Sequence, residues 1–384
     1  MRSVHAAGRS RRISIVQLAL GSAFTLAACT AFAAPSFEGL TLPPGFRIEA
    51  YVDNLPLARQ MAFGPKGTLF VGTMRLAIGP GSKPADKVYA IRTVNGKRVV
   101  ATLLSGLNNP NGVAVRDGAL YVAEVNRITR YDDIENHLDK PGKGVEIAKL
   151  PPEQHHGWRY IAFGPDGKLY VPIGAPCNVC DKDKDGYAQI LRMNADGTGR
   201  EIVAHGVRNS VGFAWQPGSN KLWFTDNGRD ELGDNVPDCE LNRVDKLGAH
   251  YGFPFCHAGS VVDPQFGKLG TCAQTVQPAQ KLGPHVAPLG ILFYTGKQFP
   301  GEYQNQAFIA QHGSWNRSQP IGYRLMRVKL NGDNVAEYQP FLTGWLKPSG
   351  DVTGRPVDLK LLPDGSMLVS DDQIGAIYRI SYSK

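Results

Sequence analysis

Two histidines and an arginine stand directly before a predicted strand pair near the middle of the chain. The residues are His155, His156 and Arg159, within the segment EQHHGWRYIAFGPDGKLYVPIG at 153–174. The strand-type residues of this segment and its Gly-Pro-Asp-Gly turn at 164–167 predict a β-hairpin. Loops at the rim of a sheet protein often carry reactive side chains, and an imidazole can accept a proton near neutral pH. The segment is therefore a candidate site for acid–base chemistry.

The hairpin part of this segment recurs along the chain, whereas its histidines do not. Copies of a strand–turn–strand pattern occur at 60–73, 111–124, 159–174, 211–226, 291–313 and 356–371. Further short strands are expected at 87–91, 128–131, 190–193 and 323–330. One four-stranded sheet per repeat is typical of a β-propeller. We expect an all-β, six-bladed β-propeller over residues 35–384, with two stacked β-sandwiches as the alternative. The unrepeated insertions, at about 227–290 and 300–320, are the functional candidates.

The first 34 residues have the composition of an export signal. Four arginines precede an apolar stretch from about 13 to 28, and small residues follow up to Ala33 or Ala34. This pattern predicts a signal peptide over residues 1–34 and a periplasmic or secreted mature protein. The apolar run is short for a transmembrane anchor. Ser10-Arg-Arg-Ile13 also resembles a twin-arginine signal, and Cys29 lies in a sequence that resembles a lipoprotein site; the alanine-rich cleavage site that follows favours a soluble protein.

Charge and cysteine content narrow the class of protein. The formal net charge is +8, and it falls to +4 without the first 34 residues, which carry four arginines and no acids. With no Lys/Arg block, this is no footprint of nucleic-acid binding. Five cysteines remain, and in an oxidising compartment even sets indicate disulfides. We expect Cys256 to pair with Cys272. Cys177 and Cys180 form either a short-loop disulfide or a redox or metal motif, which leaves Cys239 as the odd one.

Seven motifs then follow one another along the mature chain. They are HGWRYIAFGPDGKLYVPIG (156–174), HGVRNSVGFAW (205–215), FTDNGRDELGDN (224–235), ELNRV (240–244), YGFPFCHAG (251–259), QHGSWNR (311–317) and GRPVDL (354–359). Together they resemble the PQQ-dependent glucose/sorbosone dehydrogenase family, and its sorbosone dehydrogenase branch in particular. The resemblance implies a six-bladed propeller that holds pyrroloquinoline quinone (PQQ) over the central channel, with a calcium ion beneath it. It implies oxidation of a sugar hydroxyl or aldehyde hydrate, with hydride passing to the quinone.

The resemblance assigns a catalytic role to the histidine segment. The family's catalytic histidine stands eight residues before the first glycine of the Gly-Pro-Asp turn, and counting back from Gly164 gives His156. His155 is one step off and is kept as the alternative. Arg159 fits the sorbosone-type pattern, and it contacts either the substrate or cofactor, or a surface acid.

The resemblance also implies a set of cofactor contacts. Arg208 and Asn209 match the family's PQQ-contacting pair, and a guanidinium suits the three carboxylates of PQQ. Where glucose-type members place a lysine, this chain offers His312 or Arg317. Arg355 matches the first of two family arginines, and Val357 stands at the second. Trp315 either lines the substrate site or closes a blade.

The calcium site is implied at a loop between two strands. Gly228 and Arg229 match the residues whose backbone carbonyls hold calcium in the family, and oxygen ligands suit calcium. The acids nearby form either a further calcium site or a solvated loop; they are Asp226, Asp230, Glu231, Asp234, Asp238 and Glu240.

These residues predict an exported, PQQ- and calcium-dependent dehydrogenase of a sugar, polyol or sugar aldehyde. No haem signature is present, because Asp181 follows Cys180, so electrons are expected to leave to a separate acceptor. Two alternatives stay open. One is a non-catalytic, ligand-binding propeller. The other is a calcium-dependent hydrolase of the lactonase type, which requires carboxylates and asparagines that converge on one central metal.

Overall fold

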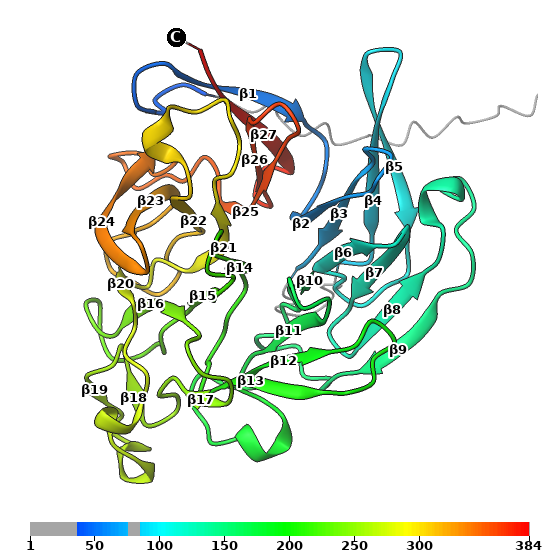
Figure 1. Cartoon of the computed structure of the whole chain (residues 1–384). Helices are drawn as coiled ribbons and strands as arrows, with labels where there is room; N and C mark the ends of the chain where they lie inside the picture. The colour runs from blue at the N-terminus through cyan, green and yellow to red at the C-terminus, as the bar shows by residue number, and fades with distance from the viewer. Residues whose placement is uncertain (1–36, 76–84, 384) are drawn as a thin grey trace, which may run out of the picture. The chain divides into compact units, whose positions relative to one another are not determined.

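In the described residues, six β-sheets of four or five strands follow one another along the chain and surround a common centre (Figure 1). The computed structural model describes residues 37–75 and 85–383. The expected six-bladed β-propeller is confirmed. The predicted signal peptide and Cys29 lie outside the described residues. No helix in the described part is long and apolar enough to cross a membrane.

Each sheet is one blade, whose strands run in order from the innermost to the outermost. Blade 1 is β2 (Ala58–Phe63), β3 (Leu69–Thr73), β4 (Val88–Val94) and β5 (Lys97–Leu104). Blade 2 is β6 (Gly112–Arg116), β7 (Ala119–Ala123), β8 (Arg127–Tyr131) and β9 (Val145–Lys149). Blade 3 is β10 (Ala162–Phe163), β11 (Leu169–Ile173), β12 (Gln189–Met193), β13 (Glu201–His205) and the parallel strand β17 (Ala249–His250).

The remaining three blades repeat this order. Blade 4 is β14 (Phe213–Trp215), β15 (Leu222–Asp226), β16 (Asp238–Arg243) and β20 (Gln280–Pro284). Blade 5 is β21 (Pro288–Phe293), β22 (Ala307–Gln311), β23 (Arg324–Asn331) and β24 (Asn334–Leu342). Blade 6 is β25 (Pro356–Leu361), β26 (Met367–Asp371), β27 (Ala376–Tyr382) and β1 (Phe46–Val52).

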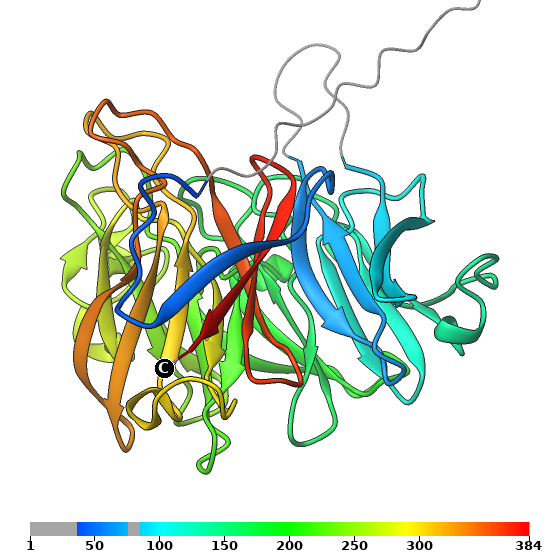
Figure 2. The same cartoon turned by 90° about the horizontal axis from the view of Figure 1, so that it is seen from above.

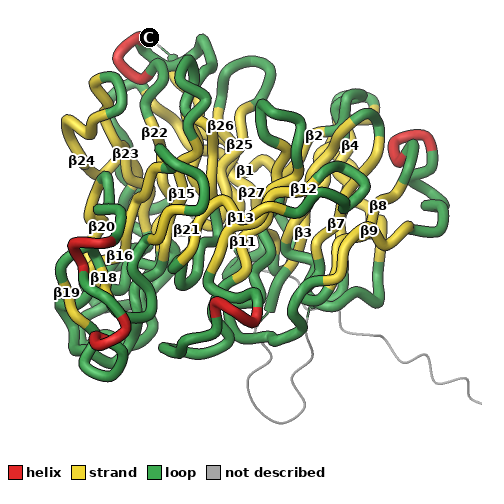
Figure 3. The backbone as a smooth tube through the Cα atoms, turned by 60° about the horizontal axis from the view of Figure 1, so that its bottom comes forward, coloured by secondary structure: helices red, strands yellow, loops and turns green. Residues whose placement is uncertain are grey.

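The six repeats found in the sequence are the two inner strands of each blade. In blade 3 the turn between them forms as its residues predict: the amide of Gly164 donates to Lys168 O at 2.9 Å, and Gly167 adopts a φ of +75°. A positive φ is easily reached by glycine and rarely by other residues. Helix is confined to five short 3-10 turns in the described part: η1 (Ile134–Asn136), η2 (Asp183–Asp185), η3 (Gly267–Leu269), η4 (Cys272–Gln274) and η5 (Gly301–Tyr303) (Figure 3).

The two ends of the described chain close the ring in blade 6. The N-terminal strand β1 lies antiparallel to the C-terminal strand β27, from Phe46 opposite Tyr382 to Val52 opposite Ile377 (Figure 2). The Phe46 ring packs edge-on against Phe299, Tyr303, Phe341 and Tyr382. Because β1 and β27 pair with each other, the two ends of the described chain complete one blade and so close the ring.

Polar side chains join the inner strands of neighbouring blades. Gln60 of blade 1 accepts hydrogen bonds from the amides of Val113 in blade 2 and Ile161 before blade 3, at 3.1 and 3.0 Å. Thr225 of blade 4 donates to Leu289 O of blade 5 at 2.7 Å. These buried bonds fix the blades relative to one another, so loops at the rim are carried by a rigid scaffold.

The insertion expected at about 227–290 contains β16 and β20 of blade 4 and the segment between them. It carries β17, the hairpin of β18 (Cys256–His257) and β19 (Val261–Val262), and η3 and η4. The Cys256–Cys272 disulfide is confirmed, and Cys177 and Cys180 form the short-loop disulfide. Cys239 is a buried free thiol, and burial raises its pKa to about 11.

Candidate active site

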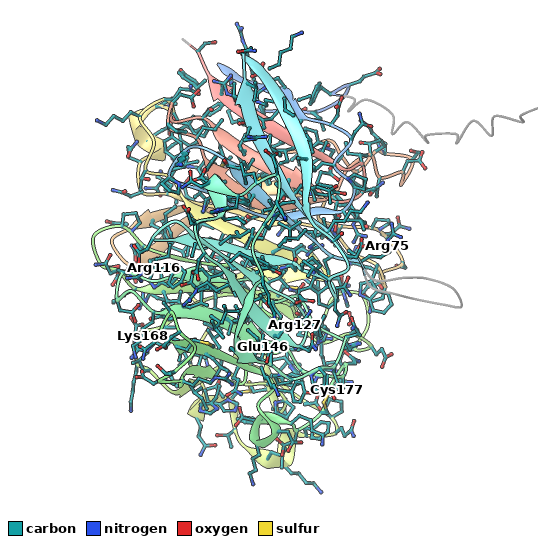
Figure 4. The ribbon with its side chains drawn as sticks, turned by 90° about the vertical axis from the view of Figure 1, so that its right-hand side faces the viewer. Arg75, Arg116, Arg127, Glu146, Lys168 and Cys177 are labelled. Atoms are coloured by element: carbon teal, nitrogen blue, oxygen red, sulfur yellow. A yellow bond between two sulfur atoms is a disulfide. The ribbon has the colours of Figure 1, made fainter. Side chains whose placement is uncertain are left out.

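A cavity of about 660 Å³ lies where the inner strands begin, and residues of five blades line it. Most of its lining residues come from two kinds of loop: those that lead into an inner strand and those that follow the second strand of a blade. Figure 4 places Arg75 and Cys177 toward this face and the turn residues Arg116 and Lys168 toward the opposite one. Four non-glycine lining residues adopt a positive φ, which concentrates backbone strain at this rim: Leu57, His156, His285 and Ala287.

His156 lines the cavity and is held in a defined orientation. Its Nδ1 lies 2.9 Å from Ala175 O, and the residue is 6% exposed. A carbonyl only accepts, so Nδ1 carries the proton and Nε2 carries the lone pair. A Cβ on Gly174 would lie 2.6 Å from the Cβ of His156, so glycine permits this close approach. Burial, then the charge of Arg208, holds the pKa of His156 well below its ordinary value. The imidazole is therefore a neutral proton acceptor at neutral pH.

His155 also lines the cavity, and its ring lies 4.1 Å from that of His156. The residue as a whole is exposed, but part of its imidazole ring is buried, and this burial lowers the pKa of His155. Both histidines named from the sequence thus reach the same cavity, and only His156 is tethered through a buried ring nitrogen. The assignment of the base to His156 stays a prediction with a geometric argument in its favour.

Arg159 lies outside the cavity lining, so the expected contact with substrate or cofactor needs correction. It is fully buried, and its guanidinium donates to Val125 O, His156 O and Pro151 O at 3.0, 3.1 and 2.9 Å. Burial lowers its pKa to about 10. Three carbonyl acceptors around a buried guanidinium make Arg159 a residue that fixes the backbone of the His156 loop. The sequence shows an arginine near a rim but not that the surrounding loop covers it.

Arg208 and Asn209 enter the cavity from the loop before β14. Asp226, at the end of β15, accepts from the amides of Asn209 and Arg208 at 2.6 and 2.9 Å, which fixes this loop. Burial, then the charge of Glu240, raises the pKa of Asp226 to about 8, and burial raises that of Glu240 to about 7. Oδ1 of Asn209 is buried and has no hydrogen-bond partner among the described residues. An unpartnered polar atom at a cavity wall is an expected contact point for a ligand.

All five N–H donors of Arg208 are occupied. Nε donates to Asn178 O, Nη1 to Asn227 O and Gly228 O, and Nη2 to Asn178 Oδ1 and Asp230 Oδ2, at 2.8 to 3.1 Å. Arg208 therefore presents a fixed positive charge to the cavity rather than free donors.

One of the backbone oxygens predicted to bind calcium, Gly228 O, already accepts a hydrogen bond from Arg208. Gly228 lines the cavity, but its carbonyl accepts from Arg208 at 2.8 Å, and a calcium ion bound there would face the guanidinium charge. Arg229 does not line the cavity, and its buried side chain pairs with Asp263. Within residues 37–75 and 85–383, no group of three or more His, Cys, Asp or Glu is placed to hold a metal ion. Calcium would bind at Gly228 only if this carbonyl exchanged the Arg208 guanidinium for the ion, so no step of the chemistry is assigned to it.

His312 and Arg355 meet on the opposite wall. His312 Nε2 lies 2.8 Å from Asp372 Oδ1, and burial lowers the pKa of this histidine to about 4. Asp372 also forms an ion pair with Arg59. Burial alone would raise the pKa of Asp372, but its cationic partners hold it below its ordinary value. Arg355 donates to His312 O at 3.2 Å and Gly313 O at 3.4 Å, so three of its five N–H groups have no acceptor in the described part of the chain.

Arg317 does not reach the cavity. Its guanidinium is taken up by Asp234 O, Gln319 O and Asn235 Oδ1, at 2.6 to 3.0 Å. His312 and Arg317 were the two residues expected to replace the lysine of glucose-type members. Of these two, His312 is the one that lines the cavity. Trp315 lines the cavity and is 75% exposed, which rules out a blade-core role.

Sequence reasoning missed several lining residues. Arg59 and Asp372 flank the first and last repeated strand–turn–strand units and lie outside the motifs that supplied the candidates. A signal was present in the sequence, since an arginine stands directly before the first copy, as Arg355 does before the last. His285 precedes β21 and is held by Gly233 O at 2.9 Å.

The charges that line the cavity favour an anion. Four arginines line it (Arg59, Arg75, Arg208 and Arg355), against two aspartates (Asp230 and Asp372). The lining is otherwise largely apolar and includes Trp158, Val211 and Leu289. A cavity of this kind suits a planar ligand that carries carboxylates.

Comparison with known proteins agrees with this geometry. A family model described as TrAA12-like matches residues 40–383. The chain belongs to the TrAA12-like family. An uncharacterized protein of Borreliella burgdorferi is 35% identical over 376 residues, which covers 94% of this chain and 96% of the relative. Aldose sugar dehydrogenase YliI of Escherichia coli is 28% identical and covers 65% and 66%.

Solved structures share the fold of this TrAA12-like protein. The calcium structure of the Trichoderma reesei enzyme of carbohydrate-active family AA12 has a TM-score of 0.77 at 20% identity, over 92% of this chain and all of the other. The holo form of the pyranose dehydrogenase PQQ domain of Coprinopsis cinerea has a TM-score of 0.74 at 18% identity, over 91% and 98%.

The residues at the cavity fit PQQ. Its carboxylates match the excess of arginines, the free N–H groups of Arg355 can donate to them, and the unpartnered Oδ1 of Asn209 can accept from the ligand.

Proposed function

We propose that this protein is a PQQ-dependent sugar dehydrogenase. The observation that carries the proposal is the combination, in one cavity of about 660 Å³, of an arginine-rich wall and a buried histidine held as a neutral base. Membership of the TrAA12-like family and the names of its relatives support the same activity.

The chain's own residues would do three things. Arg355, Arg208 and Asn209 would bind and orient the cofactor, which when bound supplies the redox chemistry by accepting hydride from the sugar carbon. His156 would take the hydroxyl proton of the same carbon at Nε2, while Ala175 O holds Nδ1–H. Trp158 and Trp315 would line the sugar-binding part of the cavity.

Reconstitution of the purified protein tests this proposal. PQQ is titrated into the cofactor-free protein, and bound-quinone absorbance and dye reduction are followed with a panel of aldoses, polyols and sugar aldehydes. Saturable binding with sugar-dependent dye reduction is expected, and activity with sugar aldehydes would support the sorbosone-type branch. Binding without turnover on any substrate would support the non-catalytic propeller instead.

Two finer points belong to the proposal. Export to the periplasm or medium, by cleavage near residue 34, is tested by mass spectrometry of the mature N-terminus, which would also reveal a lipid at Cys29. Calcium held by the carbonyls of Gly228 and Arg229 requires Arg208 to release an acceptor. Release of PQQ on chelation, with the far-UV circular dichroism unchanged, would support it.

A further inference from the structure

One short segment contacts both His156 and Arg208, two of the residues to which the proposed function assigns a role. After β11, Ala175 O accepts from His156 Nδ1 at 2.9 Å, and the amide of Ala175 donates to Arg208 O at 2.8 Å. Three residues on, Asn178 holds the guanidinium of Arg208 twice, through its backbone carbonyl at 2.8 Å and its Oδ1 at 2.9 Å. No other described residue accepts two hydrogen bonds from different nitrogens of this guanidinium.

Asn178 also holds the loop on the far side of Arg208. Its Oδ1 accepts from the amide of Asp230 at 2.9 Å, and its Nδ2 donates to Asp230 O and to Glu231 Oε2, each at 3.2 Å. Asp230 Oδ2 in turn accepts from Arg208 at 3.1 Å. Asn178 therefore fixes the guanidinium and its acidic partner in one arrangement.

A disulfide closes the loop that carries Asn178. Cys177 and Cys180 flank Asn178 and Val179 and are joined to each other. Cys177 and Val179 also pack against an apolar cluster of Ala175, Ala188 and Phe253. A cross-link across so short a loop limits the conformations open to Asn178, so its bonds to Arg208 cost little further ordering.

We propose that Asn178, presented by the Cys177–Cys180 loop, is the positioning residue that holds the Arg208 charge at the cavity and so sets its affinity for the anionic cofactor. This inference rests on the proposed function. Asn178 does not line the cavity, so it acts through Arg208 and not on the cofactor. Without its side chain, Arg208 would turn toward the carboxylate of Asp230, and its charge would be drawn away from the ligand.

PQQ titration into three variants beside the wild type tests the proposal. Asn178→Ala is expected to weaken PQQ binding about tenfold, the effect of one hydrogen bond to a charged group. Val179→Ala loosens the same loop but keeps every bond to Arg208, and is expected to bind within about twofold of wild type. Cys177→Ser/Cys180→Ser keeps the Asn178 side chain in an open loop, and a smaller loss than that of Asn178→Ala is expected. Equal or tighter binding by Asn178→Ala would overturn the proposal.

A double-mutant cycle separates positioning from a general loss of stability. If Asn178 acts through Arg208, Asn178→Ala should have no further effect in an Arg208→Ala background. Additive losses in the cycle would mean that Asn178 acts by another route, and the proposal would be wrong.

Hydrogen exchange separates this inference from the proposed function. In the cofactor-free protein, Asn178→Ala should speed exchange at the Asp230 amide at least about tenfold, because that amide loses its acceptor, whereas Val179→Ala should not. If wild type fails to bind PQQ, the proposed function fails, and this exchange measurement still decides whether Asn178 holds the loop. Unchanged exchange at Asp230 would overturn the positioning role itself.

Discussion

The two walls of the cavity each contain a histidine and an arginine, but the partners of these residues differ. His156 is buried, and His312 is partly buried. His156 donates through Nδ1 to a carbonyl, which leaves its outer nitrogen, Nε2, as the acceptor. His312 uses its outer nitrogen to donate to Asp372. Arg208 has all five donors occupied, whereas Arg355 has three without an acceptor in the described residues.

This difference separates chemistry from binding. The wall with His156 can accept a proton and supplies a fixed charge. The wall with Arg355 can donate hydrogen bonds to a ligand carboxylate and holds its histidine as a structural donor. Each wall has a histidine and an arginine, so residue type alone would assign both walls the same role. The hydrogen-bond partners of these residues are what separate the two roles.

The largest expected effect is on the rate of sugar oxidation. At saturating PQQ, His156→Ala should lose about 10²–10⁴-fold in kcat, typical of a positioned base, with PQQ affinity unchanged. His155→Ala and His312→Ala are the matched controls and should lose far less in kcat. Dye-reduction assays measure these rates. If His155→Ala were inactive and His156→Ala active, His155 would be the base instead of His156.

Loss of Arg159 should affect stability more than binding. Arg159→Leu leaves two buried carbonyls and one partly buried carbonyl without their donor, and we expect a loss of about 3 kcal/mol in the free energy of unfolding. Urea unfolding followed by fluorescence measures it. Arg317→Ala, at a surface guanidinium, should cost less than about 0.5 kcal/mol. Wild-type stability of Arg159→Leu would contradict the burial of this side chain.

Replacement of Arg355 should weaken the affinity for PQQ more than replacement of Arg208. Arg355→Ala should weaken PQQ binding by about 3 kcal/mol, because Arg355 has donors available to a carboxylate, and Arg208→Ala by about 1.5 kcal/mol, because it acts as a charge alone. Isothermal titration gives both values. The opposite ranking would mean that Arg208 exchanges its protein acceptors for the ligand, and the distinction between the walls would fail.

The sequence predicted the scaffold well because the propeller repeats a local pattern. Each Gly- or Asp-containing turn between strand-type residues is specified by its own few residues, so all six inner hairpins were found. The closure of β1 on β27 joins residues more than 300 positions apart and leaves no local pattern.

Site residues were predicted unevenly for a related reason. His156, Arg208, His312 and Arg355 were located by motifs placed close to the strand pairs, and all four line the cavity. The same motifs also selected Arg159, whose burial depends on the loops that cover it. The Arg59–Asp372 pair went unnoticed because it joins residues of the first and last blades.

The pH dependence of a single turnover tests the central claim most directly. Anaerobic stopped-flow of the PQQ-loaded enzyme with sugar isolates the reductive half-reaction from the acceptor. His156 must be neutral to accept a proton, and its pKa is lowered by burial and by Arg208. The rate of quinone reduction should therefore stay constant as the pH is lowered from neutral to about 6.5, the ordinary pKa of histidine. It should decrease only at lower pH. His156→Gln should be slow at every pH and lack this acid limb. An acid limb that persists in His156→Gln, or one that lies above the ordinary histidine value in wild type, would contradict the assignment of the base.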